Sequence, residues 1–343
     1  MKPLRFAVFG AGFWTRYQLA AWGEVGGVEC VGIYNRTLSK AQAIADEFGI
    51  PVAMDDPTGL LGKVKPDFVD NITEIGGHKP LSLLCARHRI PSICQKPMAP
   101  SLSDARAMVS AFRAHKTPFF VHENWRWQAP MRALIQALRA GTIGPPFRAR
   151  LTMISGFDCW ASQPALLSLK NFILTDLGTH LLDTARACFG EATSLYCLLH
   201  RTLAPAVQGE NVATLLLSMG KPRTSVIIEM AYAKTPLERD VFPQTLAFVE
   251  GPRGTLEITG DYWLRLTTAK GTVTSRHPPP HYAWVNPHYE VAQASIVGCH
   301  RNLLRALRGQ APAETTGADN LKTMALVFAA YQSARKNAAI TCL

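Results

Sequence analysis

The sequence predicts an α/β protein with two domains: a doubly wound parallel sheet over residues 1–122 and an α+β domain with a large, mostly antiparallel open sheet over residues 123–343. Three observations support this prediction. Short strand and helix candidates alternate up to residue 122. Longer strand candidates then follow one another without helices between them. The length of 343 residues also exceeds what one compact core usually holds.

The first domain is expected to consist of β-α-β units. Short apolar segments predict its strands, and helix-compatible segments lie between them. This alternation favours parallel strands joined by right-handed crossovers. The strand candidates are residues 4–9, 28–34, 68–72, 92–94 and 119–121, and the helix candidates are residues 14–22, 39–48, 80–88 and 101–114.

The second domain is expected to combine a few helices with a run of strands. Helix candidates at 131–140 and 175–189 come first, and a Pro-rich stretch at 277–287 precedes helix candidates at 289–308 and 317–336. Consecutive strands joined by tight turns indicate antiparallel pairing. The strand candidates are residues 192–201, 212–218, 224–232, 246–250, 255–259 and 262–268.

The composition excludes several classes of function. The net charge of +11 is spread along the chain without a basic run interleaved with aromatics, so no nucleic-acid partner is expected. No apolar run approaches the roughly 20 residues that span a bilayer, so no membrane partner is expected either. The eight cysteines show no CxxC pair and no zinc-ligand spacing. Reduced thiols, a cytoplasmic location and no metal are the expectation.

A glycine turn follows the first strand candidate directly. Residues 10–15 read GAGFWT and lead into a helix candidate, which is the strand-turn-helix context of a Rossmann dinucleotide fingerprint. Glycines let the backbone approach a pyrophosphate at the helix N-terminus. Thr15 stands at the third position, where glycine or alanine is usual. The predicted dinucleotide contacts in this turn are Gly10, Gly12, Phe13 and Trp14.

The end of the second strand candidate bears on the choice of cofactor. An acid there would accept hydrogen bonds from the ribose 2′-hydroxyl, but this chain has Asn35 followed by Arg36. Arg36 could stack on adenine or pair with a 2′-phosphate, or it could be a surface arginine after a strand. The residues therefore leave both NAD and NADP open, with Asn35 and Arg36 as candidate contacts.

Five further segments resemble, in order and spacing, the landmarks of the glucose-fructose oxidoreductase, inositol dehydrogenase and MocA (Gfo/Idh/MocA) family of oxidoreductases. They read TEIGGH at 73–78, ICQKP at 93–97, HENWRW at 122–127, DLGTHLLD at 176–183 and TTGADN at 315–320. The resemblance covers essentially the whole chain. It implies a dinucleotide-binding Rossmann domain at 1–122, a substrate-binding and oligomerisation domain at 123–343, and a homodimer or homotetramer.

Lys96 is the first candidate catalytic residue. Pro97 disfavours helical backbone at Lys96, which follows a strand at the edge where open α/β sheets bind ligands. A lysine there can stabilise an oxygen as its proton leaves; the alternative is a solvated lysine beside a proline turn. The family usually has glutamate where this chain has Gln95. A neutral amide in that place is expected to destabilise the protonated form of Lys96, if the two side chains are close.

Asp176 and His180 are the other two candidate catalytic residues. They are four residues apart on a predicted helix and therefore share a face. An imidazole can accept the proton that a secondary alcohol releases as it gives up hydride, and Asp176 can orient the imidazole or bind a substrate hydroxyl. A structural ion pair or a helix cap is the alternative for such a pair.

The resemblance and the aromatic residues extend the list of candidate contacts. Thr73, His78, Gln95 and Lys96 are expected to contact the cofactor. Flat aromatic faces suit the C–H faces of sugars, although core packing is the alternative for any one tryptophan. The predicted substrate contacts are Lys96, Asn124, Trp125, Arg126, Asp158, Trp160, Asp176, His180 and Tyr282.

The predicted function is NAD(P)-dependent oxidation of a hydroxyl group on a sugar or polyol by hydride transfer. The segments QKPMAPS and HENWRWQ are similar to a subgroup of the family that oxidises D-apiose and related aldoses to lactones. Oxidation of an inositol, or reduction of an imine or enone, is the alternative on the same fold. A dinucleotide-binding redox regulator without turnover is the alternative of a different class, and Lys96, Asp176 and His180 argue against it.

Overall fold

The computed structural model describes residues 2–202, 207–233 and 244–342, which form two compact units. The first unit joins the chain up to Glu123 with Ile296–Met324, and the second joins Asn124–Ser295 with the chain from Ala325 onward. The expected division at residue 122 assigned all later residues to the second domain. Residues 296–324 instead return to the first unit, where His300 stacks on Trp22 with 3.8 Å between ring centroids.

The first unit contains a six-stranded parallel sheet in the order β3-β2-β1-β4-β5-β6. This order is the doubly wound Rossmann arrangement, with its switch point between β1 and β4. The sequence prediction missed β3 and α3, which are short, and it placed the start of α4 too late. The elements are β1 Leu4–Phe9, α1 Phe13–Val25, β2 Val28–Tyr34, α2 Leu38–Phe48, β3 Ala53–Met54, α3 Pro57–Val64, β4 Phe68–Asn71, α4 Ile75–Arg87, β5 Ser92–Gln95, α5 Leu102–Ala114 and β6 Phe119–His122.

The core of the first unit holds a carboxyl group among aromatic rings. Phe6 on β1 stacks on Phe68 of β4, with 5.1 Å between ring centroids. The indole of Trp22 on α1 donates to Asp70 Oδ2 at 2.8 Å, and His300 Nε2 lies 4.0 Å from the same oxygen. Asp70 is 1% exposed, and its burial raises the pKa of this carboxyl to about 7.

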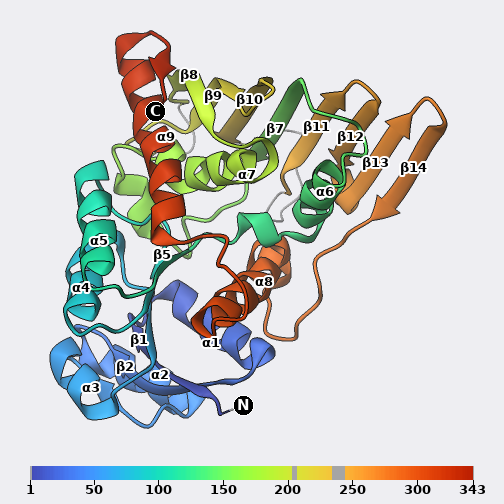
Figure 1. Cartoon of the computed structure of the whole chain (residues 1–343). Coiled ribbons are helices and arrows are strands. Elements are labelled where there is room, and N and C mark those ends of the chain that lie inside the picture. Colours follow the sequence, from blue (N-terminus) through green and yellow to red (C-terminus); the bar gives the residue numbers. More distant parts are fainter. Residues whose placement is uncertain (1, 203–206, 234–243, 343) are drawn as a thin grey trace. The chain divides into compact units, whose positions relative to one another are not determined.

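The second unit contains a nine-stranded sheet in the order β14-β13-β12-β11-β7-β10-β9-β8-β15 (Figure 1). Within the described residues, β7 and β10 pair in parallel and the other neighbours pair antiparallel, so the predicted sheet type is confirmed. The sequence prediction missed β7, β14 and the short β15. The strands are β7 Arg148–Ser155, β8 Ala192–His200, β9 Val212–Met219, β10 Thr224–Tyr232, β11 Leu246–Gly251, β12 Gly254–Thr259, β13 Trp263–Thr268, β14 Gly271–Arg276 and β15 Ile340–Thr341.

Helices cover one face of this sheet. Helix α6 packs against β12 and β13, and α7 packs against β10. Alternate residues of β9 are buried, as expected for a strand with one covered face. The helical segments are η1 Trp125–Trp127, α6 Ala129–Arg139, η2 Pro164–Ser168, η3 Leu174–Gly178, α7 Thr179–Phe189, η4 Gly260–Tyr262, η5 Pro287–Tyr289, α8 Glu290–Leu307 and α9 Gly317–Lys336.

The buried carboxyl of Asp70 predicts a pH-dependent stability. Its pKa rises from 3.8 to about 7 on folding, so the folded state holds the extra proton between these values. The contribution of Asp70 to the free energy of unfolding should therefore fall as the pH rises from about 4 to about 8. Burial lowers the pKa of His300, which gives an opposite slope that wild type and an Asp70 variant share.

We expect Asp70→Asn, which keeps an acceptor for Trp22, to remove this fall. Urea unfolding at each pH should show wild type losing up to about 4 kcal/mol relative to the variant between the two pH values. The same pH dependence of the free energy of unfolding in wild type and Asp70→Asn would contradict the raised pKa of Asp70.

Candidate active site and dinucleotide site

The glycine turn between β1 and α1 has a specific steric requirement. Gly10 has φ +109°, and a Cβ on it would lie 2.8 Å from the carbonyl oxygen of Ile72, so only glycine fits. The Thr15 hydroxyl accepts from the Gly12 N–H at 3.1 Å and donates to the Gly10 carbonyl at 3.2 Å. Thr15 thus holds the turn from inside, which accounts for its presence where glycine or alanine is usual.

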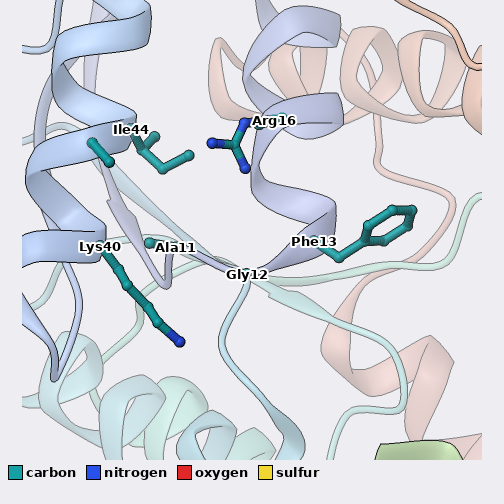
Figure 2. A pocket seen from close by; sticks show the side chains of 7 residues that line it. Ala11, Gly12, Phe13, Arg16, Lys40 and Ile44 are labelled. Atoms are coloured by element: carbon teal, nitrogen blue, oxygen red, sulfur yellow. The ribbon is translucent and has the colours of Figure 1, made fainter. Parts of the chain in front are cut away.

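A pocket of about 360 Å³ lies between the N-terminal parts of α1 and α2 (Figure 2). Figure 2 shows Lys40 and Arg16 as the charged side chains on its wall. Arg16 Nε lies 2.7 Å from Glu47 Oε2, so its charge is paired. The sequence analysis missed Arg16 because it lies beyond the glycine turn, one turn into the helix. The lining residues are Ala11, Gly12, Phe13, Arg16, Lys40, Ala43 and Ile44.

The predicted ribose readers differ in what their side chains do. Asn35 Oδ1 accepts from the Ala11 N–H at 3.2 Å, and its Nδ2 donates to the Thr37 carbonyl at 3.0 Å. The Asn35 amide therefore links the end of β2 to the glycine turn. Arg36 is exposed and does not line the pocket in Figure 2. Open space at Gly12, where a Cβ would touch nothing, fits an extended dinucleotide along this turn.

His78 connects the loops that follow β4 and β5. It is 1% exposed, and its Nε2 and Nδ1 lie 2.8 Å from the Thr73 carbonyl and 2.9 Å from the Pro97 carbonyl. Burial lowers the pKa of His78, and which ring nitrogen donates depends on the tautomer. Both ring nitrogens face backbone carbonyls. This geometry favours a positioning role over the direct cofactor contact that the sequence analysis expected.

Gln95 and Lys96 lie at the carboxyl end of β5, as the sequence predicted. Gln95 Oε1 accepts from the Lys96 backbone N–H at 2.8 Å, so the amide side chain folds back onto the main chain. A glutamate could accept the same hydrogen bond. Lys96 is half-buried.

Asp176 lies in a π-helical turn, η3, that runs directly into α7. The sequence predicted a regular helix over 175–189, but the wider π turn begins it instead. Such turns are rare and are frequent at functional sites. Tyr232 at the end of β10 donates to Asp176 Oδ2 at 3.0 Å. Burial and the neighbouring carboxylate raise the pKa of Tyr232 well above its usual value, so the phenol stays protonated as a donor.

Glu210 anchors the start of this π turn. Its carboxylate accepts from the Phe172 N–H at 2.9 Å, and its backbone carbonyl accepts from the Ile173 N–H at 3.2 Å. The Tyr331 hydroxyl of α9 donates to the same carboxylate at 2.6 Å. These contacts from distant parts of the sequence hold the backbone from which Asp176 projects.

His180 is buried against the indole of Trp125. The two rings are nearly parallel, 17° apart, with 3.8 Å between their centroids. His180 is 3% exposed and Trp125 is 4% exposed. Trp125 Nε1 donates to Thr245 Oγ1 at 3.0 Å, which fixes the plane of the indole. Trp125 thus packs on the candidate proton acceptor, and its predicted contact with the substrate stays a prediction.

Arg126 and Asn124 also make internal contacts. The Arg126 guanidinium donates through Nε and Nη2 to the two carboxylate oxygens of Asp183 at 2.5 and 2.7 Å. Asn124 Nδ2 donates to the Ala292 carbonyl and to Ser295 Oγ, at 3.0 and 2.7 Å. These bonds favour a positioning role for both residues, which the sequence analysis expected on the substrate.

The remaining predicted substrate contacts fall into separate groups. Asp158 is exposed, and its carboxylate accepts from the Trp160 N–H at 3.1 Å within a turn. The centroid of the Trp160 ring lies 5.4 Å from that of Tyr232, the residue that donates to Asp176. Tyr282 stacks on Trp284 in the Pro-rich stretch, at 5.5 Å. Tyr232 itself was missed, although its strand was predicted.

Three general features accompany this geometry. Within the described residues, no group of three His, Cys, Asp or Glu side chains could hold a metal ion. None of the helices described is long and apolar enough to cross a membrane. The eight cysteines are all free thiols.

Comparison with known proteins identifies the family. Residues 4–123 match the oxidoreductase family model with an NAD-binding Rossmann fold, and residues 131–260 match the GFO/IDH/MocA C-terminal domain. D-Apiose dehydrogenase from Paraburkholderia graminis is 41% identical over 98% of this chain and 89% of its own length. D-Apiose dehydrogenase from Rhizobium rhizogenes is 38% identical over 97% of this chain and 96% of its own length.

A solved structure agrees with this assignment. An oxidoreductase from Agrobacterium radiobacter, in complex with NAD⁺, L-tartaric acid and magnesium, is 36% identical, superposes with a TM-score of 0.96 and covers 99% of both chains. The chain therefore belongs to the Gfo/Idh/MocA family and is a nicotinamide-dependent oxidoreductase that acts on CH–OH groups.

Proposed function

We propose that the enzyme oxidises an aldose, with D-apiose as the leading candidate, at the anomeric hydroxyl to give the lactone. The observation that carries this proposal is the turn in which Tyr232 holds Asp176 directly before the buried His180. Such a turn presents an oriented carboxylate and an imidazole to a hydroxyl. The two D-apiose dehydrogenases that match nearly the whole chain support the choice of sugar.

The proposed mechanism separates the hydride from the proton. A bound nicotinamide supplies the hydride acceptor. The imidazole of His180 takes the hydroxyl proton as the carbonyl forms, and Asp176 orients the substrate or the imidazole. The ammonium of Lys96 stabilises the oxygen as negative charge develops on it. One hydride and one proton leave the sugar, and the ring remains intact as a lactone.

One assay, the production of reduced nicotinamide, tests both the substrate and the acid/base role of His180. Production of reduced nicotinamide should be fastest with D-apiose in a panel of aldoses and inositols, and the product should be a lactone by mass spectrometry. With the best substrate, His180→Asn should lower kcat by about 10²- to 10⁴-fold, because a positioned proton acceptor contributes about that much.

The matched control is His200→Asn, because His200 is an exposed histidine at the end of β8 and should be dispensable. A kcat of His180→Asn within threefold of wild type would reject the acid/base role. A preference for inositols over all aldoses would favour the alternative substrate class.

We further propose that the enzyme accepts NADP⁺ as well as NAD⁺. Asn35 takes the place of an acid and is bonded to the backbone, so nothing at that position repels a 2′-phosphate. Lys40 lines the pocket of Figure 2, and Arg36 is exposed beside the same strand end. The NAD⁺ in the Agrobacterium radiobacter structure supports NAD⁺ as one of the two cofactors.

Removing the Lys40 ammonium should weaken the use of NADP⁺ more than the use of NAD⁺. Lys40→Ala should lower kcat/KM for NADP⁺ about tenfold more than for NAD⁺, since a hydrogen bond to a charged group contributes about 1.5 to 3 kcal/mol. Lys63→Ala, at the end of α3, is the control and should leave the ratio unchanged. A wild-type enzyme with a large preference for NAD⁺, unaltered by Lys40→Ala, would show that the proposal is wrong.

We also propose a homodimer or homotetramer assembled through the open sheet. Leu198 and Leu216 are 54% and 52% exposed on the face opposite α6 and α7, and Ile154 and Leu246 continue this apolar face across β7 and β11. A second sheet would remove this surface from water.

Charge on that face should disrupt the assembly. Leu216→Arg should shift the protein toward monomer in sedimentation velocity, because the arginine would be buried without a partner. Val273→Arg is the control, since Val273 is 69% exposed on β14 but pairs with Leu266 on the opposite face. A monomeric wild type, or equal behaviour of both variants, would contradict this interface.

The thiols support a reducing compartment, and we propose the cytoplasm. Five of the eight cysteines are fully buried, and the other three are partly exposed. Burial raises the pKa of Cys30 and Cys85 to about 12, which keeps both thiols protonated and unreactive.

A further inference from the structure

The stack of Trp125 on His180 is a contact between the face of an indole and the face of an imidazole. The centroid separation of 3.8 Å and the angle of 17° place the imidazole over the electron-rich face of the indole. Both residues are buried, so little water screens this interaction. The hydrogen bond from Trp125 Nε1 to Thr245 Oγ1 keeps the indole from turning its edge toward the imidazole.

The electrostatic consequence depends on the charge of the imidazole. The face of an aromatic ring carries negative charge density and attracts a cation, so it favours imidazolium over neutral imidazole. Burial alone acts in the opposite direction, because it disfavours the charged form. A buried histidine that must accept a proton therefore needs a local stabiliser of the protonated state.

Other charged groups surround this helix and are retained in both Trp125 variants. The elements that pack closely on α7 are η1, η3, α6 and β10. Arg126 and Asp183 neutralise one another, and Arg132 lies over Trp127, 5.5 Å from the ring centroid. Asp176 adds negative charge beside the turn and is bonded to Tyr232. The remaining titratable groups on these elements are Arg139 on α6, Arg186 and Cys188 on α7, and Glu229 on β10.

We propose that Trp125 is a positioning and tuning residue whose indole face stabilises protonated His180 and thereby makes this imidazole the stronger proton acceptor in alcohol oxidation. The proposal rests on the function assigned to His180 above. It replaces a substrate contact for Trp125 with a role exerted through the imidazole. No partner beyond this chain is required, since Trp125, Thr245 and His180 belong to one unit.

The pH profile of kcat tests the catalytic consequence. Oxidation requires neutral His180, so kcat should rise with pH through the pKa of this residue. Trp125→Leu keeps an apolar side chain but removes the aromatic face, and should move the acidic limb to lower pH by about one unit. Trp125→Phe keeps a weaker aromatic face and should move it by about half as much. Trp127→Leu, in the same short helix, is the matched control and should leave the limb in place.

A titration without turnover separates this inference from the proposed function. Carbon-13 labelling of histidine gives a ring resonance for His180, which is assigned by its loss in His180→Asn. The pKa of His180 should decrease in the order wild type, Trp125→Phe, Trp125→Leu. Melting temperatures identify any variant that fails to fold. If Trp125→Leu does not fold, the pKa of His180 is compared between wild type and Trp125→Phe.

The outcomes divide as follows. The stated order in both the resonance titration and the kcat profile supports the inference. An unchanged pKa in Trp125→Leu, or a raised one, overturns it, because the indole would then act only by excluding water. The stated order in the titration together with wild-type kcat in His180→Asn upholds the stabilisation of protonated His180 but rejects its role in catalysis.

Discussion

The buried ion pair between Arg126 and Asp183 organises the segment of the second unit that carries His180. Their side chains are 7% and 0% exposed, and two parallel hydrogen bonds join them. Removing one partner of such a pair typically costs about 3 to 5 kcal/mol, because the other charge stays buried without compensation. The pair connects η1 to α7. It therefore fixes the position of Trp125, one residue before Arg126, relative to His180, one turn before Asp183.

The π turn depends on a second set of anchors. Its backbone hydrogen-bonding pattern is rare, and the surrounding structure must hold it. Glu210 provides a carboxylate and a carbonyl for the N–H groups of Phe172 and Ile173, directly before the turn, and Tyr331 fixes that carboxylate. Tyr232 then fixes the carboxylate of Asp176. The orientation of Asp176 is thus set by residues from β10, α9 and the loop before β9.

The first unit applies a different constraint, which is close packing of backbone at the carboxyl ends of the strands. The loop after β4 approaches the glycine turn so closely that Gly10 cannot carry a side chain. The same loop is joined through His78 to the loop after β5, which carries Lys96. Pro97 predicted the loop after β5, and the family resemblance indicated the loop after β4, but nothing local in the sequence indicates that one imidazole connects them.

The sequence by itself determined the two sheets, the glycine turn and the positions of Lys96, Asp176 and His180 along the chain. Strand-helix rhythm and turn residues are local properties, and the ordered motifs carry the family resemblance. The short strands β3 and β15 have too few residues for any periodicity, so pairing with neighbours alone defines them.

Only the tertiary structure decided which of the candidate side chains make contacts with distant parts of the chain. Trp125, Arg126 and His78 looked alike in the sequence as polar or aromatic residues near the site, but each is bonded to a group far away in the chain. His78 and Pro97 lie 19 residues apart in the sequence, and Arg126 and Asp183 lie 57 residues apart. Their roles follow from close packing and from the need to satisfy buried polar groups, and both are properties of the folded chain.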